Sequence, residues 1–541
     1  MENYIKKYGN LITIIGLIIV CVLVYFLNIG QYPLMDVDET RYVSMARDMF
    51  HSKDFMTLFL NGEYFFEKPP LYFWGECLSF WIFGGVTEFS ARVPGAVYGT
   101  LLTFLVYFLG RKVVSHRFGL ISALVLTTFV EFGMLARYAI LDIVLTAMVG
   151  FSVLFGFLTQ FVAEKNKKYF WWLFYIFSGL AVMAKGIPGV ILPFGIMFFV
   201  TIFNKTFKQC FKLTYIIPGI ILFLLIVLPW HIAMFTTHDP LFFNEYIMKH
   251  HVNRFFSSSE IDRAQPFYFY IITLLWGALP YTLSLIAVGI EKIAERTKIN
   301  FSDMSDSRKF LWFNIIAFCF TLLFFSASST KLITYILPIY FFLAYITGFI
   351  WDEYIFEGKH TRSVNIAVYI LGGIFVFASI AACFIKCFLP VQLCNDILVA
   401  KWFCIILLFL TGTAGILFVL KKKPLGAFLT YVIFIALVSG FETKVFYEID
   451  FKFGQNDLIK FATMGKKNKD KLYVINNPRK YSVLYYGDQA TYLFMKDLPS
   501  GIFMPKAKTI IRTKELDDLA KLYKFDILKQ GRKYSFIQMK K

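Results

Sequence analysis

Long apolar runs separated by short polar segments dominate this chain. A helix that spans a bilayer needs about 20 mostly apolar residues, and thirteen segments approach that length and composition. The pattern predicts an all-α polytopic membrane protein with about 13 transmembrane helices. The predicted spans lie near residues 10–29, 92–110, 118–136, 143–162, 170–184, 187–203, 213–235, 267–290, 310–326, 332–350, 364–386, 402–420 and 425–440.

Composition agrees with the pattern. Of the 541 residues, 58% are apolar and 17% are charged, against about 45–50% and about 25% in soluble globular chains. The mean hydropathy of +0.61 excludes a water-soluble enzyme and a disordered chain. The net charge is +19. Because the basic residues are spread thinly between apolar runs, we exclude nucleic acid as a partner.

The basic clusters fix an orientation for the predicted spans. They precede the first span and follow each even-numbered one, so all of them lie on one side of the membrane. That side is predicted to be cytoplasmic, which puts the N-terminus in the cytoplasm and, after an odd number of spans, the C-terminus outside. The clusters lie near residues 6–7, 111–117, 165–168, 205–212, 291–309, 359–362 and 421–423.

Two outer segments are long enough to fold. Residues 30–91 are rich in carboxylates and contain amphipathic stretches, which predict helices lying in the membrane interface. Residues 441–541 have an ordinary composition, with strand-like runs at 471–475 and 482–486 and a helix-like stretch at 514–523. The chain is therefore divided into a transmembrane domain, 1–440, and a small outer α/β domain, 441–541.

Ionisable residues gather at the outer ends of the spans. A proton- or sodium-coupled transporter would place such groups near the midplane. The observed pattern instead suits an enzyme whose substrate has one end in lipid and one end in water. A lipid or polyprenyl-sugar flippase that performs no chemistry, and a structural membrane protein with solvated outer charges, remain as alternatives.

The densest cluster is Met35-Asp36-Val37-Asp38-Glu39-Thr40-Arg41-Tyr42, just outside the first span. Acidic residues favour a helix N-terminus, so a solvated helix start is one interpretation. The other is catalytic, because a carboxylate can take a proton from an attacking hydroxyl group. Asp38 and Glu39 are the candidate bases, with Arg41 beside them.

A second motif is Phe66-Glu67-Lys68-Pro69-Pro70-Leu71-Tyr72-Phe73-Trp74. The two prolines stiffen the backbone and would hold Lys68 in a fixed position. Lys68 is either an interfacial lysine beside an aromatic belt or a cation for a leaving phosphate.

Further candidates lie at span ends. Arg254 offers a planar fork for phosphate oxygens, and His251 beside it could bind a metal together with Glu67 or Glu245, although two neighbouring histidines are more often only interfacial. Asp142 enters a span and needs a partner, whether structural or catalytic. Lys331 opens another span. Cys387 and Cys394 fall in one predicted outer loop, and the sequence leaves open whether they form a disulfide.

Taken together and in this order, the motifs resemble the bacterial aminoarabinose lipid A transferases and the protein O-mannosyltransferases, which are polyprenyl-phosphate-sugar glycosyltransferases of the GT-C class. The resemblance covers roughly residues 30–340. It is carried by Asp38-Glu39-Thr40-Arg41-Tyr42, Phe66-Glu67-Lys68-Pro69, Ala91-Arg92-Val93-Pro94, Tyr138 to Asp142, Ala184-Lys185-Gly186, Leu228-Pro229-Trp230, His251 to Phe255 and Thr334-Tyr335-Ile336-Leu337-Pro338.

The resemblance implies a GT-C fold in the bacterial inner membrane, with a periplasmic site under the interfacial helices of the first loop. It implies an inverting transfer that requires no cofactor, with a divalent metal at His251 as the weaker alternative. The implied roles are catalytic for Asp38, Glu39 and Asp142, donor-phosphate binding for Lys68, Arg41, Arg254 and Lys331, and cavity lining for Tyr335, Glu67 and Lys185.

The predicted activity is transfer of a sugar, aminoarabinose-like or a hexose, from a polyprenyl-phosphate donor to an outer-leaflet acceptor. The run Ser329-Thr330-Lys331-Leu332-Ile333 differs from the Lys-Gly-Lys-Leu-Pro of the aminoarabinose transferases. That difference leaves the acceptor open between a lipid A-type lipid, another glycan and a protein. The sequence does not identify the sugar, the oligomeric state or the role of residues 441–541.

Overall fold

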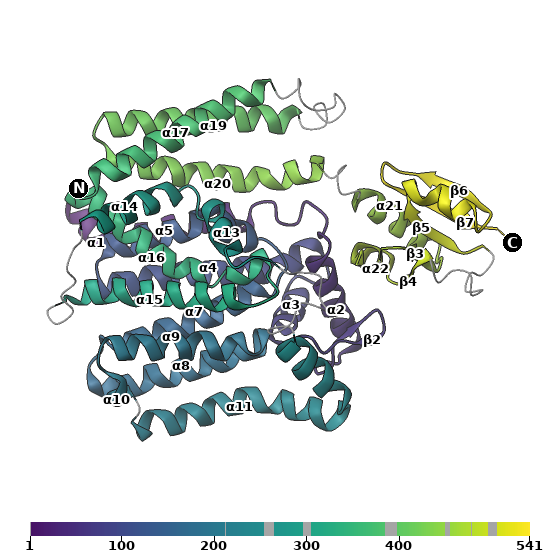
Figure 1. Ribbon diagram of the computed structural model, residues 1–541, viewed down its shortest axis with the longest axis horizontal. Coiled ribbons are helices and arrows are strands. Elements are labelled where there is room, and N and C mark those ends of the chain that lie inside the picture. Colours follow the sequence, from purple (N-terminus) through teal and green to yellow (C-terminus); the bar gives the residue numbers. More distant parts are fainter. Residues whose placement is uncertain are drawn as a thin grey trace.

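The computed structural model describes residues 2–210, 212–253, 265–295, 304–384, 398–449, 455–477, 479–495 and 506–540, with the backbone alone for 2–9, 250–253, 398–400 and 442–449. Long helices lie side by side in one bundle, and a small α/β domain sits at one end of it (Figure 1). The described part of the chain is mostly helical, as the apolar pattern predicted.

Every predicted span contains helix. The helices of the bundle are α1 (Glu2–Cys21), α4 (Glu88–Val113), α5 (His116–Thr128), α6 (Val130–Leu135), α7 (Asp142–Leu158), α8 (Glu164–Lys185), α9 (Pro188–Phe203), α10 (Phe207–Cys210), α11 (Leu213–His238), α13 (Phe269–Gly277), α14 (Thr282–Ala294), α15 (Asp306–Ala327), α16 (Ile339–Asp352), α17 (Thr361–Cys383), α19 (Leu398–Leu420) and α20 (Pro424–Ile449). Three π-helical segments, Val22–Phe26, Phe243–Asn253 and Glu353–Glu357, and the 3₁₀ turn Ile333–Ile336 complete the bundle.

Among the described residues, seven helices are long and apolar enough to cross a membrane, and a bent pair raises the number to eight. Shorter apolar helices cover three further predicted spans. The bent pair is α13 and α14, which turn by 116° where the sequence predicted one span over 267–290. Pro280 lies at this break and has no N–H with which to continue a helix.

The first loop forms two helices, as its amphipathic stretches predicted, and their position in the membrane interface stays a prediction. They are α2 (Asp38–Ser52) and α3 (Leu71–Ile82), joined by a hairpin of β1 (Phe59–Leu60) and β2 (Glu63–Tyr64). The buried face of α2 includes Tyr42, Met45 and Met49, and it packs on α3. Most residues of α2 from Glu39 to Met49 are buried, and the helix lies at the end of the bundle nearest the α/β domain (Figure 1).

The C-terminal domain is built on a five-stranded sheet of order β4-β3-β5-β7-β6. β3 pairs in parallel with β4 and β5, and β7 runs antiparallel to β5 and β6. Side chains alternate across the sheet, so Val474 packs towards α21 while Tyr473 packs towards α23. The elements are α21 (Gln455–Lys467), β3 (Leu472–Ile475), α22 (Tyr481–Gly487), β4 (Thr491–Leu493), β5 (Lys508–Arg512), the 3₁₀ turn Thr513–Glu515, α23 (Leu516–Ala520), β6 (Phe525–Gln530) and β7 (Tyr534–Met539).

Two details of this domain differ from the sequence prediction. The run 482–486 was predicted as a strand, but it lies in helix α22. Val483 is buried against the sheet while Tyr485 and Tyr486 contact the first loop, so tertiary packing overrides the β propensity of these residues. Helix α20 also continues past the predicted boundary at residue 440 and ends at Ile449.

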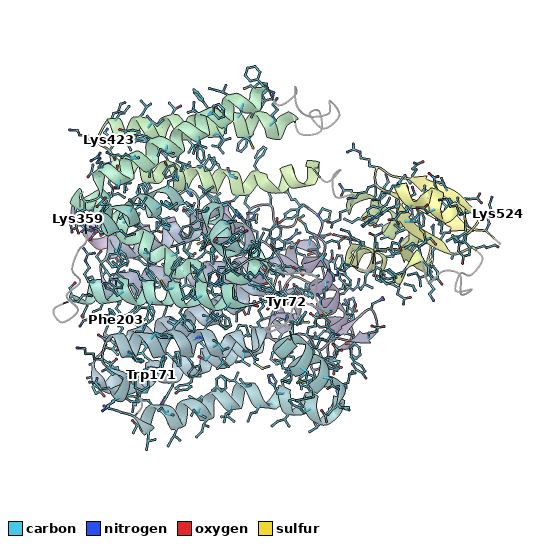
Figure 2. All side chains as sticks on the ribbon, viewed as in Figure 1. Tyr72, Trp171, Phe203, Lys359, Lys423 and Lys524 are labelled. Carbon is cyan, nitrogen blue, oxygen red and sulfur yellow. The ribbon has the colours of Figure 1, made fainter. Side chains whose placement is uncertain are left out.

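The predicted cytoplasmic clusters share one end of the bundle. Lys359 and Lys423 lie at the end away from the α/β domain, which carries Lys524 (Figure 2). The first loop lies at the domain's end. The structure thus separates the two sets of polar segments that the charge pattern assigned to opposite sides of a membrane.

Candidate active site

The first turn of α2 carries two of the candidate site residues. Asp38 and Glu39 are its first two residues, and carboxylates there interact favourably with the positive end of the helix dipole. Although the two are neighbours in sequence, their side chains enter different surroundings. Asp38 is half-buried, whereas Glu39 is 3% exposed.

Glu39 is held inside the protein by Arg92 from α4. The Arg92 Nε and Nη2 donate to the two carboxylate oxygens, each at 2.8 Å. The backbone N–H groups of Met35 and Ala139 donate to the same carboxylate at 2.9 and 2.8 Å. The carboxylate therefore ties the first loop to α4 and to the segment before α7. Its catalytic role stays a prediction, and this geometry favours Asp38 as the reacting acid.

Arg41 lies one turn further along α2, in an aromatic recess. Its Nη2 is 2.7 Å from the Glu67 Oε1, and its guanidinium lies 4.8 Å from the ring centre of Phe65 and 6.0 Å from that of Tyr481. The Arg41 Nε is buried and has no hydrogen-bond partner among the described residues. Arg41 therefore keeps one N–H for an anionic ligand.

Lys68 is the residue after Glu67 in the chain. Its ammonium group is almost fully buried and donates to the Glu67 carbonyl oxygen at 3.0 Å. Pro69 and Pro70 then lead into α3, with Pro70 immediately before its first residue. Lys68 is thus next in the chain to the residue that pairs with Arg41, and its fixed position stays a prediction.

Charges from several segments affect the pKa of the Tyr42 hydroxyl group. Burial holds the pKa of its hydroxyl group well above the usual value. The negative charges of Asp38 and Asp142 raise this pKa further, and that of Glu67 adds to them. The positive charge of Arg41 lowers it. Acids from α2, from the Lys68 motif and from the start of α7 therefore act on one phenol.

Asp142 and Lys185 form an ion pair at the start of α7 and the end of α8, with both side chains 9% exposed. The Lys185 ammonium lies 3.9 Å from the ring centre of Tyr335, on the 3₁₀ turn before α16. The partner that Asp142 was expected to need is thus Lys185. Three sequence-predicted residues from three separate segments form one cluster.

Lys331 is buried close to this turn. Its ammonium group donates to the backbone carbonyls of Gln265 at 2.9 Å and Ser328 at 2.6 Å. Burial lowers the pKa of Lys331. The described contacts join Lys331 to the loop before α13, and none of them joins it to Arg41 or Lys68.

Several predicted residues fall outside the described part of the chain. Arg254, Cys387 and Cys394 lie outside the described residues, and for His251 only the backbone is described. Among the side chains that are described, no group of three His, Cys, Asp or Glu could hold a metal ion.

The sequence did not assign roles to two buried arginines. Arg92 and Arg137 are both 0% exposed. Arg137 donates to the carbonyl oxygens of Val24 and Leu27 at 2.6 and 2.7 Å, which are carbonyls at the end of the first span that helix geometry leaves unsatisfied. The sequence showed only that each of these arginines lies beside an apolar run. The residues that each arginine contacts are far away in sequence.

The C-terminal domain contacts the start of α2 directly. The Ser482 N–H and Oγ donate to the Asp36 carboxylate at 2.8 and 2.7 Å, and Thr40 donates to the same carboxylate at 2.7 Å. Asp36 is thus a residue that the sequence placed in the acidic cluster without a role. Tyr481, beside Ser482, is the residue that faces Arg41.

Further along the same interface, Arg47 of α2 donates to the Tyr485 carbonyl oxygen at 2.8 Å. Tyr486 accepts from the Leu34 N–H and donates to Glu88, each at 2.9 Å. One helix of the domain, α22, therefore covers α2 from its first turn to its middle, and the domain forms part of the wall around Arg41.

The chain is similar to known proteins. Residues 10–242 match the family of dolichyl-phosphate-mannose-protein mannosyltransferases. An undecaprenyl phosphate-α-4-amino-4-deoxy-L-arabinose arabinosyl transferase of Pseudomonas fluorescens is 28% identical over 62% of this chain and 56% of its own length. One from Proteus mirabilis is 28% identical over 62% and 58%. The matches thus span somewhat more than half the length of these relatives.

A solved structure shares the fold. ArnT from Cupriavidus metallidurans, crystallised with undecaprenyl phosphate, superposes with a TM-score of 0.78 over 97% of both chains, at 17% identity. This agreement covers the bundle and the C-terminal domain. The resemblance that the motifs predicted is confirmed: the chain is similar to the mannosyltransferase family over residues 10–242 and to the aminoarabinose transferases, and it has the fold of ArnT, a multi-pass membrane protein.

Proposed function

We propose that this protein is an inner-membrane glycosyltransferase that moves a sugar from a polyprenyl phosphate to an acceptor at the outer leaflet. The observation that carries the proposal is geometric: the Arg41 guanidinium pairs with Glu67 and lies 5.9 Å from the ring centre of Tyr42. Asp38 and Asp142 are close enough for their charges to raise the pKa of the Tyr42 hydroxyl group. The relatives named for undecaprenyl phosphate-linked aminoarabinose support the donor class. All 13 predicted spans would cross the membrane, with the N-terminus in the cytoplasm and the site outside.

In the proposed reaction, an acceptor oxygen attacks the anomeric carbon of the sugar. The bond between that carbon and the phosphate oxygen breaks, and polyprenyl phosphate leaves with the electron pair. Asp38 takes the proton when the acceptor is a hydroxyl group. If the acceptor is a phosphate it has no proton to lose, and Asp38 positions it. Attack opposite the leaving group inverts the configuration.

The cations of the site act on the leaving phosphate. Charge that develops in a transition state is stabilised best by groups that are already in place. Arg41 has an unused N–H, and Lys68 is held beside it by the proline pair. Arg254 completes the set in this proposal. The positive charge comes from side chains, so we assign the reaction no metal.

Lipid A-type lipids are the proposed acceptor class, on the strength of the aminoarabinose transferases. The mannosyltransferase family match favours a second candidate, a protein hydroxyl group. The two candidate acceptors are distinguished by which molecule carries the radiolabelled sugar after transfer. A radiolabelled sugar ends in a lipid extract in the first case and in a protein band in the second.

The test uses purified full-length protein, radiolabelled polyprenyl-phosphate sugars and both acceptor classes. We expect transfer that a chelator does not slow. Lys68→Ala should lower the transfer rate at least a hundredfold, while Lys471→Ala, an exposed lysine of the C-terminal domain, keeps it. Donor binding without transfer to any acceptor would support a flippase instead. Wild-type transfer by Lys68→Ala would remove Lys68 from the scheme.

A further inference from the structure

The end of α2 opposite the candidate site borders a separate apolar pocket. The pocket has a volume of about 510 Å³, within the range of about 300–1,000 Å³ that is usual for small-molecule sites. α2 has 15 residues, so at 1.5 Å per residue its two ends are roughly 22 Å apart. The pocket is therefore distinct from the aromatic recess around Arg41.

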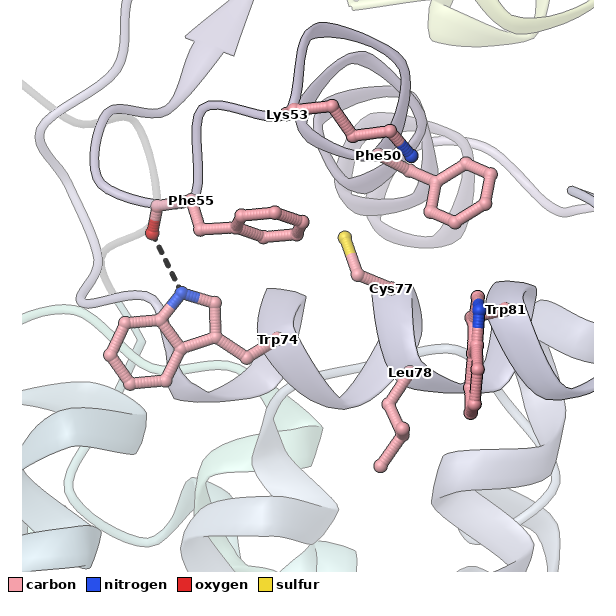
Figure 3. Close-up of a pocket in the computed structure, with 7 residues that line it drawn as sticks. All are labelled: Phe50, Lys53, Phe55, Trp74, Cys77, Leu78 and Trp81. Atoms are coloured by element: carbon pink, nitrogen blue, oxygen red, sulfur yellow. Dashed lines mark hydrogen bonds between the residues drawn. The ribbon is translucent and has the colours of Figure 1, made fainter.

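Aromatic and aliphatic side chains form the walls of the pocket. Figure 3 shows Phe50, Lys53 and Phe55 facing α3, which supplies the remaining residues. Apart from Lys53, every lining residue is apolar or a cysteine. The residues are Phe50, Lys53, Phe55, Trp74, Cys77, Leu78 and Trp81.

Two indole groups hold the loop that closes one side of the pocket. The Trp74 Nε1 donates to the Phe55 carbonyl oxygen at 2.7 Å (Figure 3), and the Trp230 Nε1 of α11 donates to the Met56 carbonyl oxygen at 2.9 Å. Each indole satisfies a backbone acceptor. The Trp74 ring also lines the pocket, whereas the Trp230 ring packs outside it against Phe242. The pocket is thus built into the fold rather than left by a loose loop.

Lys53 supplies one positive charge at the edge of this apolar space. It directly follows the last residue of α2, and its ammonium group lies 4.2 Å from the ring centre of Phe50. Within the described residues, no carboxylate pairs with it. The neighbouring Asp54 accepts instead from the backbone N–H groups of Met56 and Thr57. An apolar cavity with a single unpaired cation at its edge matches an anionic amphiphile.

The outer side of α3 continues from the pocket as an apolar surface. Leu78 is 57% exposed, Trp81 is 74% exposed and Ile82 is 59% exposed. A soluble protein rarely leaves such a surface uncovered, whereas a helix at the membrane interface presents it to lipid. The pocket therefore opens beside a surface that the bilayer covers, which is where a lipid chain can enter it.

We propose that this pocket binds one acyl chain of an anionic glycerophospholipid, whose phosphate pairs with Lys53. The lipid is a bound component at the far end of α2 and takes no part in the transfer. The inference goes beyond the proposed function, because it concerns a different cavity and needs no sugar donor.

The test uses full-length protein in phosphatidylcholine vesicles that contain a trace of phosphatidylglycerol with a photoreactive acyl chain. We expect crosslinks concentrated in the α3 peptide that contains Cys77 and Trp81. Unlabelled phosphatidylglycerol should compete with them and phosphatidylcholine should not. Lys53→Gln should weaken the labelling about fivefold, while Lys249→Gln, which removes an exposed lysine from the segment after α11, leaves it unchanged.

A second experiment fills the pocket with a larger side chain. Cys77→Trp should abolish the α3 crosslink, and Leu78→Trp narrows the pocket from an exposed position if the first variant does not fold. Labelling spread evenly over the exposed helices, equal competition by phosphatidylcholine, or unchanged labelling in Lys53→Gln would each overturn the proposal. None of these readouts depends on glycosyl transfer, so failure here and failure of the proposed enzyme are distinguishable.

Discussion

Two arginine–glutamate pairs anchor the first loop, and they differ in what surrounds them. Arg92 and Glu39 are 0% and 3% exposed, and the carboxylate accepts four hydrogen bonds. Arg41 and Glu67 are 13% and 26% exposed, with one arginine N–H unused. The first pair is complete without a ligand, whereas the second is not. The same residue types therefore give a closed structural tie in one place and, in the proposed function, a phosphate-binding group in the other.

The largest effect should come from breaking the complete pair. Glu39→Ala leaves the Arg92 guanidinium buried without its carboxylate, and loss of one partner of a buried pair costs about 3–5 kcal/mol. We expect a lower thermal unfolding midpoint in detergent and little folded protein. Glu63→Ala removes an exposed carboxylate of the same loop and should leave the midpoint unchanged. A stable Glu39→Ala protein would contradict the structural interpretation of this pair.

Asp38→Asn should next reduce transfer while the protein stays folded. The amide cannot accept the acceptor's proton, and loss of a general base lowers rates ~10²–10⁴-fold. The measurement is single-turnover transfer to a hydroxyl acceptor, together with the unfolding midpoint. Asp239→Asn, at an exposed site just beyond α11, is the control. Full activity in Asp38→Asn would shift the catalytic role to Asp142 or Glu39.

The next largest effect should come from Arg41→Gln, which removes a hydrogen-bond donor to the phosphate of the sugar donor. Removing one positioned donor costs about 10²–10³ in rate, and stability should change little because Glu67 is partly exposed. Transfer rate and the affinity for polyprenyl phosphate are measured in parallel. Arg362→Gln, exposed at the opposite end of the bundle, should match the wild type. If Arg41→Gln unfolds as Glu39→Ala does, the contrast between the two pairs fails.

The smallest effect should come from Ser482→Ala. The variant loses the Oγ bond to Asp36 but keeps the backbone N–H bond, and one such bond contributes about 0.5–1.5 kcal/mol. We expect kcat to fall up to about tenfold at unchanged KM, because Asp36 positions the start of α2 without touching substrate. Thr463→Ala, exposed on α21, is the control. An increase in KM alone would mean that Ser482 acts by another route.

The sequence predicted most of the helices and part of the site, for identifiable reasons. Apolar run length located the spans, because the bilayer sets that length. The spacing of Asp38, Arg41 and Lys68 gave candidates from local chemistry alone. The partners could not be predicted: Glu39 meets Arg92, 53 positions away, and Asp36 meets Ser482, 446 positions away. No local pattern contains such separations.

The C-terminal domain shows the same limit. A strand was predicted at 482–486 because valine and tyrosine favour strands, yet the segment forms helix α22. Helix places Val483 on the sheet and Tyr485 on α2, which needs two partners that the local sequence does not reveal. Pro280 indicated a break between α13 and α14 in the sequence, but a proline alone does not determine the angle between the two helices.

The bonds between Ser482 and Asp36 have a consequence for how the protein is made. A ribosome adds Asp36 to the chain 446 positions before Ser482, so the acidic turn emerges long before the residue that fixes it. The candidate site of a nascent chain therefore stays unfinished until Ser482 has emerged and docked. A premature stop after α20 would keep every described helix of the bundle in the chain and still remove the bonds between Ser482 and Asp36.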